Sequence, residues 1–107
     1  MSFIRVIHYR WRLGSPNESA RLARVLAASA AGEAGEAGSR GVRVLSALDG
    51  GREGLVVFEW ETRAALDAHR AATSLERVAP WAVPLLHWRT DQTYEVLAPD
   101  PGSDAPA

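Results

Sequence analysis

Three observations predict that this chain folds as one α+β domain with the element order β-α-β-β-α-β. Four segments are rich in β-branched and aromatic residues, two have the apolar spacing of amphipathic helices, and glycine- or proline-rich stretches separate them. The length of 107 residues suits a single domain, and the shares of hydrophobic (47%) and charged (23%) residues are those of an ordinary globular protein. This order of elements is the split βαβ, or ferredoxin-like, motif.

The first predicted strand spans residues 2–13 and mixes β-forming apolar residues with arginines. Because side chains alternate along a strand, one face holds Phe3, Arg5, Ile7, Tyr9 and Trp11. The other face holds Ile4, Val6, His8, Arg10 and Arg12. Neither face is purely polar, which is typical of a strand that is covered on both sides near one end.

The first helix is predicted to run from Pro16 to about Ala31. Ser15 can cap it, proline suits its first position, and Glu18 lies three residues after the cap. We expect its apolar stripe to consist of Leu22, Val25, Leu26 and Ala30. The following residues, 32–41, contain four glycines and are predicted to form a flexible loop.

Two more strands are predicted at residues 42–48 and 54–60. The segment Asp49-Gly50-Gly51 between them is a strong hairpin signal, so we expect the two strands to pair antiparallel. The run from Leu55 to Phe58 is too apolar for an exposed edge of a sheet.

The second helix is predicted to begin after Thr62, which can cap it, and to extend to about Ser74. His69 falls inside the apolar arc of this helix, between Ala65 and Ala72. The arc therefore places one titratable side chain on the packed side of the helix.

The rest of the chain is predicted to contain one more strand. Residues 75–84 are expected to be briefly helical or irregular because two prolines interrupt them, and the last strand covers residues 86–97. The end of the chain is rich in Pro, Gly and Asp. We therefore expect one domain over residues 1–98 and a disordered tail over residues 99–107.

Composition excludes several classes of function. Twelve basic and 13 acidic residues give a net charge of −1, whereas a nucleic-acid surface normally needs a basic excess. The absence of cysteine excludes disulfides, zinc–thiolate sites and cysteine nucleophiles. The chain has no apolar run of membrane-spanning length, and arginines interrupt any signal-peptide pattern, so a cytoplasmic protein without a membrane partner is expected. A domain this small buries a modest core, so a sizeable pocket would favour pairing with a second chain.

Histidines are the main candidates for chemistry, because the P-loop, dinucleotide-binding, nucleophile-elbow and zinc-protease motifs are all missing. His8 is either a proton shuttle or a hydrogen-bonded strand residue. His69 is either an acid–base group or a satisfied core histidine, and His87 opens the last strand. The spacings of the three form no known ligand motif, so no metal site is predicted.

Aromatic and arginine side chains are the candidates for binding a substrate. Trp60 ends the third strand on the same face as Val56 and Phe58, and is either the wall of a pocket for an aromatic ligand or plain core. Trp81 allows the same two interpretations. Arg10 either clamps a phenolate or carboxylate or is a solvated charge at the end of a strand.

The segment Leu55-Val-Val-Phe-Glu-Trp-Glu-Thr-Arg-Ala-Ala-Leu-Asp-Ala-His resembles the antibiotic biosynthesis monooxygenase family, whose members have a strand ending in Trp, a short polar turn and a helix. The opening Val6-Ile7-His8-Tyr9-Arg10 resembles the family's first strand, and with the element order the resemblance covers roughly residues 2–97. It implies a homodimer whose two sheets form a dimeric α+β barrel. It also implies oxidation of an aromatic polyketide anthrone to a quinone without a cofactor, in a dry pocket with a proton acceptor and stabilisation of the anion.

The resemblance carries over to particular residues. Trp60 matches the family's tryptophan at the strand end. His8 stands where several relatives have an asparagine that touches the substrate, and Val56 stands where a second asparagine would be. His69 replaces a second-helix tryptophan of haem-degrading relatives, whose haem-ligating histidine would fall near Ala79, so the resemblance disfavours haem degradation.

The residues and the resemblance together predict an enzyme of bacterial secondary metabolism, a cofactor-independent monooxygenase with an aromatic polyketide-type substrate. His8 would act as base, Arg10 would steady the anion, and His69 would complete an acid–base pair. The predicted substrate-binding residues are Val56, Phe58, Trp60, Trp81 and His87. The alternatives are a polyketide cyclase or isomerase of the same fold and a dimer that binds a small ligand without catalysis. Neither a cofactor nor a metal is expected.

Overall fold

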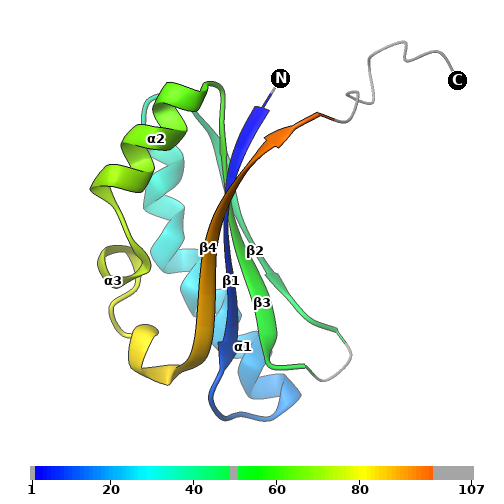
Figure 1. The fold of residues 1–107 in the computed structure, drawn as a ribbon. Coiled ribbons are helices and arrows are strands. Elements are labelled where there is room, and N and C mark those ends of the chain that lie inside the picture. The colour runs from blue at the N-terminus through cyan, green and yellow to red at the C-terminus, as the bar shows by residue number, and fades with distance from the viewer. Residues whose placement is uncertain (1, 49–50, 98–107) are drawn as a thin grey trace, which may run out of the picture.

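The computed structural model describes residues 2–48 and 51–97. It contains one sheet with its helices on one side (Figure 1). The elements are β1 (Ser2–Trp11), α1 (Pro16–Ala30), the 3-10 helix η1 (Ala31–Gly35), β2 (Ser39–Ser46), β3 (Glu53–Trp60), α2 (Arg63–Ala72), α3 (Leu75–Val78), the 3-10 helix η2 (Val83–Leu85) and β4 (Leu86–Val96). The predicted β-α-β-β-α-β order is confirmed, with the short elements α3 and η2 where brief helix or irregular structure was predicted.

The sheet is antiparallel, with the strand order β2-β3-β1-β4. The first and last strands of the chain therefore lie side by side, and β1 occupies a central position (Figure 1). The hairpin strands β2 and β3 pair as expected, with Leu45 opposite Leu55. The predicted turn at Asp49-Gly50 and the predicted tail lie outside the described residues.

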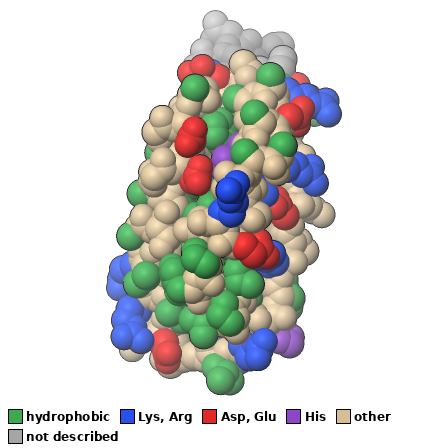
Figure 2. All heavy atoms as spheres, turned by 90° about the vertical axis from the view of Figure 1, so that its left-hand side faces the viewer, with side chains coloured by type: hydrophobic (Ala, Val, Ile, Leu, Met, Phe, Trp, Pro, Cys, Tyr) green, Lys and Arg blue, Asp and Glu red, His purple; other side chains and the backbone are tan. Residues whose placement is uncertain are grey.

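The two faces of the sheet differ in what covers them. The helices pack on the face that carries a fully buried core of strand residues, namely Ile7, Tyr9, Trp11, Val56, Phe58 and Trp60. The opposite face carries Ile4, Val6, His8 and Arg10 from β1, and Leu55 and Val57 from β3. Figure 2 shows the helix-covered side, where hydrophobic side chains gather in the lower part and acidic and basic groups lie above them.

In the first helix Leu26 and Ala30 are buried as expected and Leu22 packs against the core, but the expectation was wrong for Val25. The buried stripe of α1 consists of Ser19, Ala23, Leu26 and Ala30, whereas Val25 is 48% exposed. Ala23, and not Val25, shares the buried face with Leu26 and Ala30, because residues three or four apart lie on one face of a helix. The segment after α1 is also not an open loop throughout, because its first residues continue as η1 and β2 already begins at Ser39.

Gly54 is required by the packing of Tyr9, which lies directly opposite it across β1 and β3. A Cβ at position 54 would collide with the Tyr9 hydroxyl and with the carbonyl oxygen of Leu45. Tyr9 is fully buried, which raises its pKa to about 12, and its side chain has no room to retreat. Glycine here therefore gives the tyrosine ring its place in the core.

Gly54→Ala is expected to lower the free energy of unfolding by about 1–3 kcal/mol, the usual cost of overpacking a core. Urea denaturation followed by circular dichroism measures it. Gly32→Ala is the matched control, because a Cβ at Gly32 meets no atom within 4 Å. Equal stability of the two variants would contradict this account of Gly54.

Candidate active site

A buried arginine lies among the apolar side chains of the helix-covered face. Arg5 in β1 is only 3% exposed, and its guanidinium grips the carboxylate of Asp91 in β4. Nε donates to Oδ1 at 2.9 Å and Nη2 donates to Oδ2 at 2.6 Å, which is the bidentate geometry of a strong arginine–carboxylate pair. The pair joins two neighbouring strands beneath helix α2.

The remaining nitrogen of Arg5, Nη1, is directed at the end of α2. It donates to the carbonyl oxygens of Thr73 at 2.8 Å and of His69 at 3.4 Å. The His69 carbonyl also accepts from the backbone N–H of Thr73, whereas the Thr73 carbonyl lies beyond the last turn of the helix and is satisfied by the arginine. Arg5 thus fixes the C-terminal end of α2 to the sheet.

The imidazole of His69 lies next to this nitrogen, and His69 is 6% exposed. Its ring centre is 4.7 Å from that of Phe58 and 4.7 Å from that of Trp60. Burial is the main cause that lowers the pKa of His69, and the positive charge of Arg5 lowers it further, whereas Glu33 and Glu36 act in the opposite direction. The neutral imidazole is therefore favoured at neutral pH.

The contact with Arg5 also decides which nitrogen of His69 carries the proton. Nη1 of Arg5 is 3.2 Å from Nδ1 of His69, and a guanidinium can only donate. Nδ1 must then accept, so the proton of the neutral ring is on Nε2. Nε2 is buried, has no hydrogen-bond partner among the described residues, and lies 3.4 Å from Oε2 of Glu33.

A hollow of about 300 Å³ opens beside this histidine, between α2 and the segment that begins with η1. It is lined by Glu33, Glu36, Ala37, Trp60, Ala65, Ala68, His69, Ala72 and Thr73. The alanines of α2 leave this space because their side chains are short. Nε1 of Trp60 is a second buried N–H without a partner among the described residues. The hollow therefore combines apolar walls, two residues with free N–H donors and two carboxylates.

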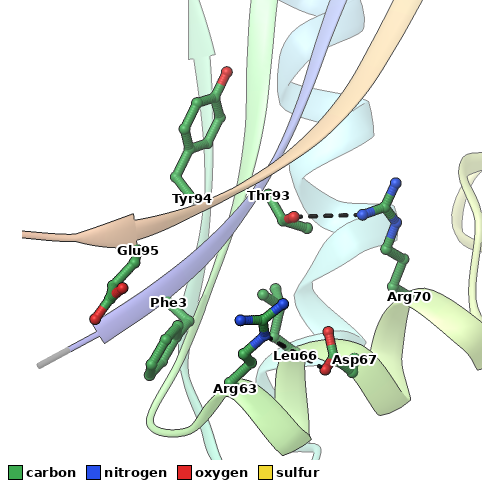
Figure 3. A pocket seen from close by; sticks show the side chains of 8 residues that line it. All are labelled: Phe3, Arg63, Leu66, Asp67, Arg70, Thr93, Tyr94 and Glu95. Carbon is green, nitrogen blue, oxygen red and sulfur yellow. Dashed lines mark hydrogen bonds and ion pairs between the residues drawn. The ribbon is translucent and has the colours of Figure 1, made fainter.

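A second hollow, of about 210 Å³, lies on the other side of α2 (Figure 3). Three of its four charged groups have partners, since Arg63 lies 3.8 Å from Asp67 and Arg70 donates to Thr93 at 3.4 Å, while Glu95 is the fourth. Phe3 and Leu66 are among its apolar walls. With no unpartnered buried donor, this hollow is the weaker candidate for a site.

The structure brings together three of the residues predicted for the site. His69 and Trp60 line the larger hollow, and Phe58 packs behind His69. Val56 lies on the same face of β3 but deeper in the core, and it does not line the hollow. The helix-covered face therefore unites the histidine of α2 with the aromatic end of β3.

His8 and Arg10 lie on the opposite face of the sheet. Both flank Glu53, at 3.7 Å from His8 and 3.6 Å from Arg10, and the ring of His8 meets Trp88 edge-on at 4.7 Å. A separate hollow of about 360 Å³ adjoins His8 there. Because the sheet separates His8 from His69, the two do not form an acid–base pair within one chain.

The last two predicted residues also lie away from the His69 hollow. Trp81 stacks on Trp11 with ring centres 6.2 Å apart, and its Nε1 donates to Ser29 at 3.0 Å. These contacts bind the segment before β4 to α1 and β1. His87 is exposed near the start of β4.

Sequence reasoning missed Arg5, Glu33 and Asp91 as site residues. The sequence did contain a signal for Arg5. It is the one charged residue on a strand face that otherwise holds Phe3, Ile7, Tyr9 and Trp11. An arginine buried on such a face is expected to have a partner. Glu33 carried none, since it stands in a stretch of alanine and glycine.

Comparison with known proteins supports the reading of the fold. The family model described as antibiotic biosynthesis monooxygenase matches residues 5–81. No curated protein matches the chain. In the described part of the chain, no helix is long and apolar enough to cross a membrane.

Solved structures resemble the chain over nearly its whole length. Rv0793 from Mycobacterium tuberculosis has a TM-score of 0.67 at 21% identity, covering 92% of this chain and 98% of that one. SnoaB, a cofactor-independent oxygenase from Streptomyces nogalater, has a TM-score of 0.67 at 16% identity, covering 94% and 97%. A dimeric protein of unknown function with a ferredoxin-like fold from Bacteroides fragilis has a TM-score of 0.66 at 13% identity, covering 89% and 96%.

At these identities the likeness to solved structures establishes the shared ferredoxin-like fold, while the family model establishes descent over most of the chain. The matched residues include the buried pair of Arg5 and His69 and the tryptophan that lines the hollow. The chain belongs to the antibiotic biosynthesis monooxygenase family.

Proposed function

We propose that the chain is a cofactor-independent monooxygenase that oxidises a small aromatic, polyketide-type substrate in the hollow beside His69. The observation that carries the proposal is the buried neutral imidazole, which presents an unpartnered N–H next to a space lined by alanines and Trp60. The anthrone-to-quinone reaction needs such a place, because the substrate must lose a proton and hold the resulting negative charge away from water.

The chemistry follows from the donors around the hollow. Removal of a proton makes the substrate electron-rich, so that it can reduce O₂ directly. One oxygen atom replaces the two hydrogens of the ring CH₂ group as a carbonyl, and the other leaves as water. The N–H of His69 would stabilise the developing oxyanion, with the positive charge of Arg5 directly behind the imidazole. Trp60 would supply a flat wall for the ring.

The same groups support one alternative. A carboxylate and an N–H donor that face one hollow can also drive enolate chemistry, so a cyclase or isomerase would need no oxygen. A site that only binds the aromatic ligand would use the same walls.

We also assign the open face of the sheet to pairing with a second copy of the chain. Ile4, Val6, Leu55 and Val57 belong to the alternate set of strand residues, opposite the buried core face. Figure 1 shows that the helices cover only one side of the sheet. Apolar side chains on an uncovered sheet face need a partner layer. The dimeric state of the Bacteroides fragilis protein is consistent with this assignment.

The test is oxygen uptake by the purified, metal-free protein with a tricyclic anthrone. Ala68→Leu fills the hollow and is expected to slow uptake by about 10- to 200-fold, the usual penalty for one misplaced aliphatic group in a pocket. Ala71→Leu is the matched control, since Ala71 is exposed on the same helix and does not line the hollow.

The outcomes separate the alternatives. Oxygen uptake that Ala68→Leu slows by this factor and Ala71→Leu leaves at the wild-type rate supports oxygenation in this hollow. Consumption of a substrate without oxygen supports the cyclase or isomerase. If the folded wild-type protein takes up no oxygen and alters no substrate, the chain binds its ligand without catalysis.

A further inference from the structure

We propose that the hollow recognises a hydroxyl group on an aromatic ring, and that Glu33 accepts the proton of this hydroxyl while Nε2 of His69 donates to its oxygen. The inference deepens the proposed function, because it names the reactive group of the substrate and the base. It assigns a binding and a catalytic role to Glu33, which was not among the site residues predicted from the sequence.

Arg5 sets the direction in which the imidazole of His69 can donate. Arg5 can only donate to Nδ1, at 3.2 Å, so Nε2 is the N–H that remains. Arg5 itself is held by both oxygens of Asp91 and by the carbonyl of Thr73, which leaves it little freedom to turn away. Arg5 is thus a positioning residue that fixes His69 as a donor.

The acceptor that faces Nε2 of His69 is the carboxylate of Glu33. Oε2 of Glu33 lies 3.4 Å from Nε2 of His69, beyond the usual N–H···O distance of about 2.9 Å. The Glu33 side chain is 19% exposed and lines the hollow. A ligand oxygen can bind between the two groups only if the Glu33 carboxylate, on its partly exposed side chain, moves away from Nε2. Glu36 lines the same hollow but comes within ion-pair distance of no histidine among the described residues.

A hydroxyl group on the ligand can bind Glu33 and His69 at the same time. A hydroxyl is a donor and an acceptor, so its hydrogen can go to Glu33 while its oxygen accepts from His69. A methyl ether offers only the acceptor, and a carboxylate would be repelled by Glu33 and Glu36. The site therefore selects a neutral hydroxyaryl ring.

Proton transfer in this arrangement is balanced within the site. The O–H bond of the ligand breaks, an O–H bond forms on the Glu33 carboxyl, and the negative charge moves to the ring oxygen. Nε2–H of His69 already faces that oxygen, and Arg5 lies behind the imidazole. The charge therefore shifts from the hydrated rim towards buried donors, where it is stabilised most strongly.

The experiment compares 2-naphthol with 2-methoxynaphthalene by calorimetric titration without oxygen. For the wild type we expect 2-naphthol to bind about 10- to 100-fold tighter, as expected for hydrogen bonds to a charged group. Glu33→Gln should remove most of this preference, and the matched control Glu61→Gln should keep it, because Glu61 is exposed and does not line the hollow. Circular dichroism verifies that both variants are folded.

A second measurement tests the donor directly. Nitrogen-15 NMR of labelled wild-type protein is expected to show His69 as the neutral form protonated on Nε2. Equal binding of the two ligands by the wild type, an unchanged preference in Glu33→Gln, or a proton on Nδ1 would overturn the inference. Because binding is measured without oxygen, a preserved naphthol preference alongside absent anthrone oxidation would refute the proposed oxygenase and leave the hydroxyl site in place.

Discussion

Arg5→Met is expected to lower the free energy of unfolding by about 3 kcal/mol, the low end of the cost of breaking a buried ion pair. The low end applies because Asp91 is 35% exposed, so water can solvate part of the carboxylate that the variant leaves behind. The carbonyl oxygen of Thr73 and Nδ1 of His69 would lose their donor, whereas the carbonyl oxygen of His69 would keep the backbone N–H of Thr73. Unpaired buried acceptors carry their own desolvation cost.

Urea denaturation of Arg5→Met measures this loss, and Arg70→Met is the matched control. Arg70 is exposed on α2 and makes one hydrogen bond, to Thr93, so its replacement should change stability by less than about 0.5 kcal/mol. If the two variants are equally stable, Arg5 does not hold α2 to the sheet as the geometry indicates.

The alternation of β1 was readable from the sequence because a strand repeats every two residues. The pattern placed Phe3, Arg5 and Ile7 on one face and Val6 and His8 on the other, which is the arrangement in the structure. The bounds of the elements were also close, since Ser15 and Thr62 both cap the helices that follow them. Local signals of this kind act within a few residues and need no knowledge of the fold.

The site depended on contacts that no local signal contains. Arg5 and Asp91 are 86 residues apart, and only the pairing of β1 with β4 brings them together. Glu33 reaches His69 because η1 continues beyond α1, a bend that the glycine-rich composition concealed. The expected acid–base pair of His8 and His69 required both side chains to lie on the same face of the sheet. His8 lies on the open face, whereas His69 belongs to helix α2, which packs on the opposite face.

Loss of the His69 donor is expected to have the largest effect on activity. His69→Phe keeps a flat ring of similar size between Phe58 and Trp60 but removes the N–H at the hollow. Removing one donor from an oxyanion site lowers kcat by about 10²- to 10³-fold, so oxygen uptake with an anthrone should fall by that factor. His69→Gln, which retains an N–H donor, should recover part of the rate.

The rate of oxygen uptake should depend on pH through the protonation of His69. The neutral imidazole accepts from Arg5 and donates from Nε2, whereas a protonated ring would place a second N–H against the guanidinium. Because burial and Arg5 lower the pKa of His69 against the opposing pull of Glu33 and Glu36, the neutral form persists below the ordinary pKa of about 6.5. The wild-type rate should therefore stay level through neutral pH and fall only on acidification below 6.5.

Kinetics at pH 7.5 and across the acid range, with His8→Phe measured alongside, decide where the reaction occurs. His8 lies on the opposite face of the sheet, so a site in the His69 hollow predicts a deep loss for His69→Phe and a much smaller change for His8→Phe. The reverse result would move the chemistry to the open face, where His8 and Arg10 flank Glu53.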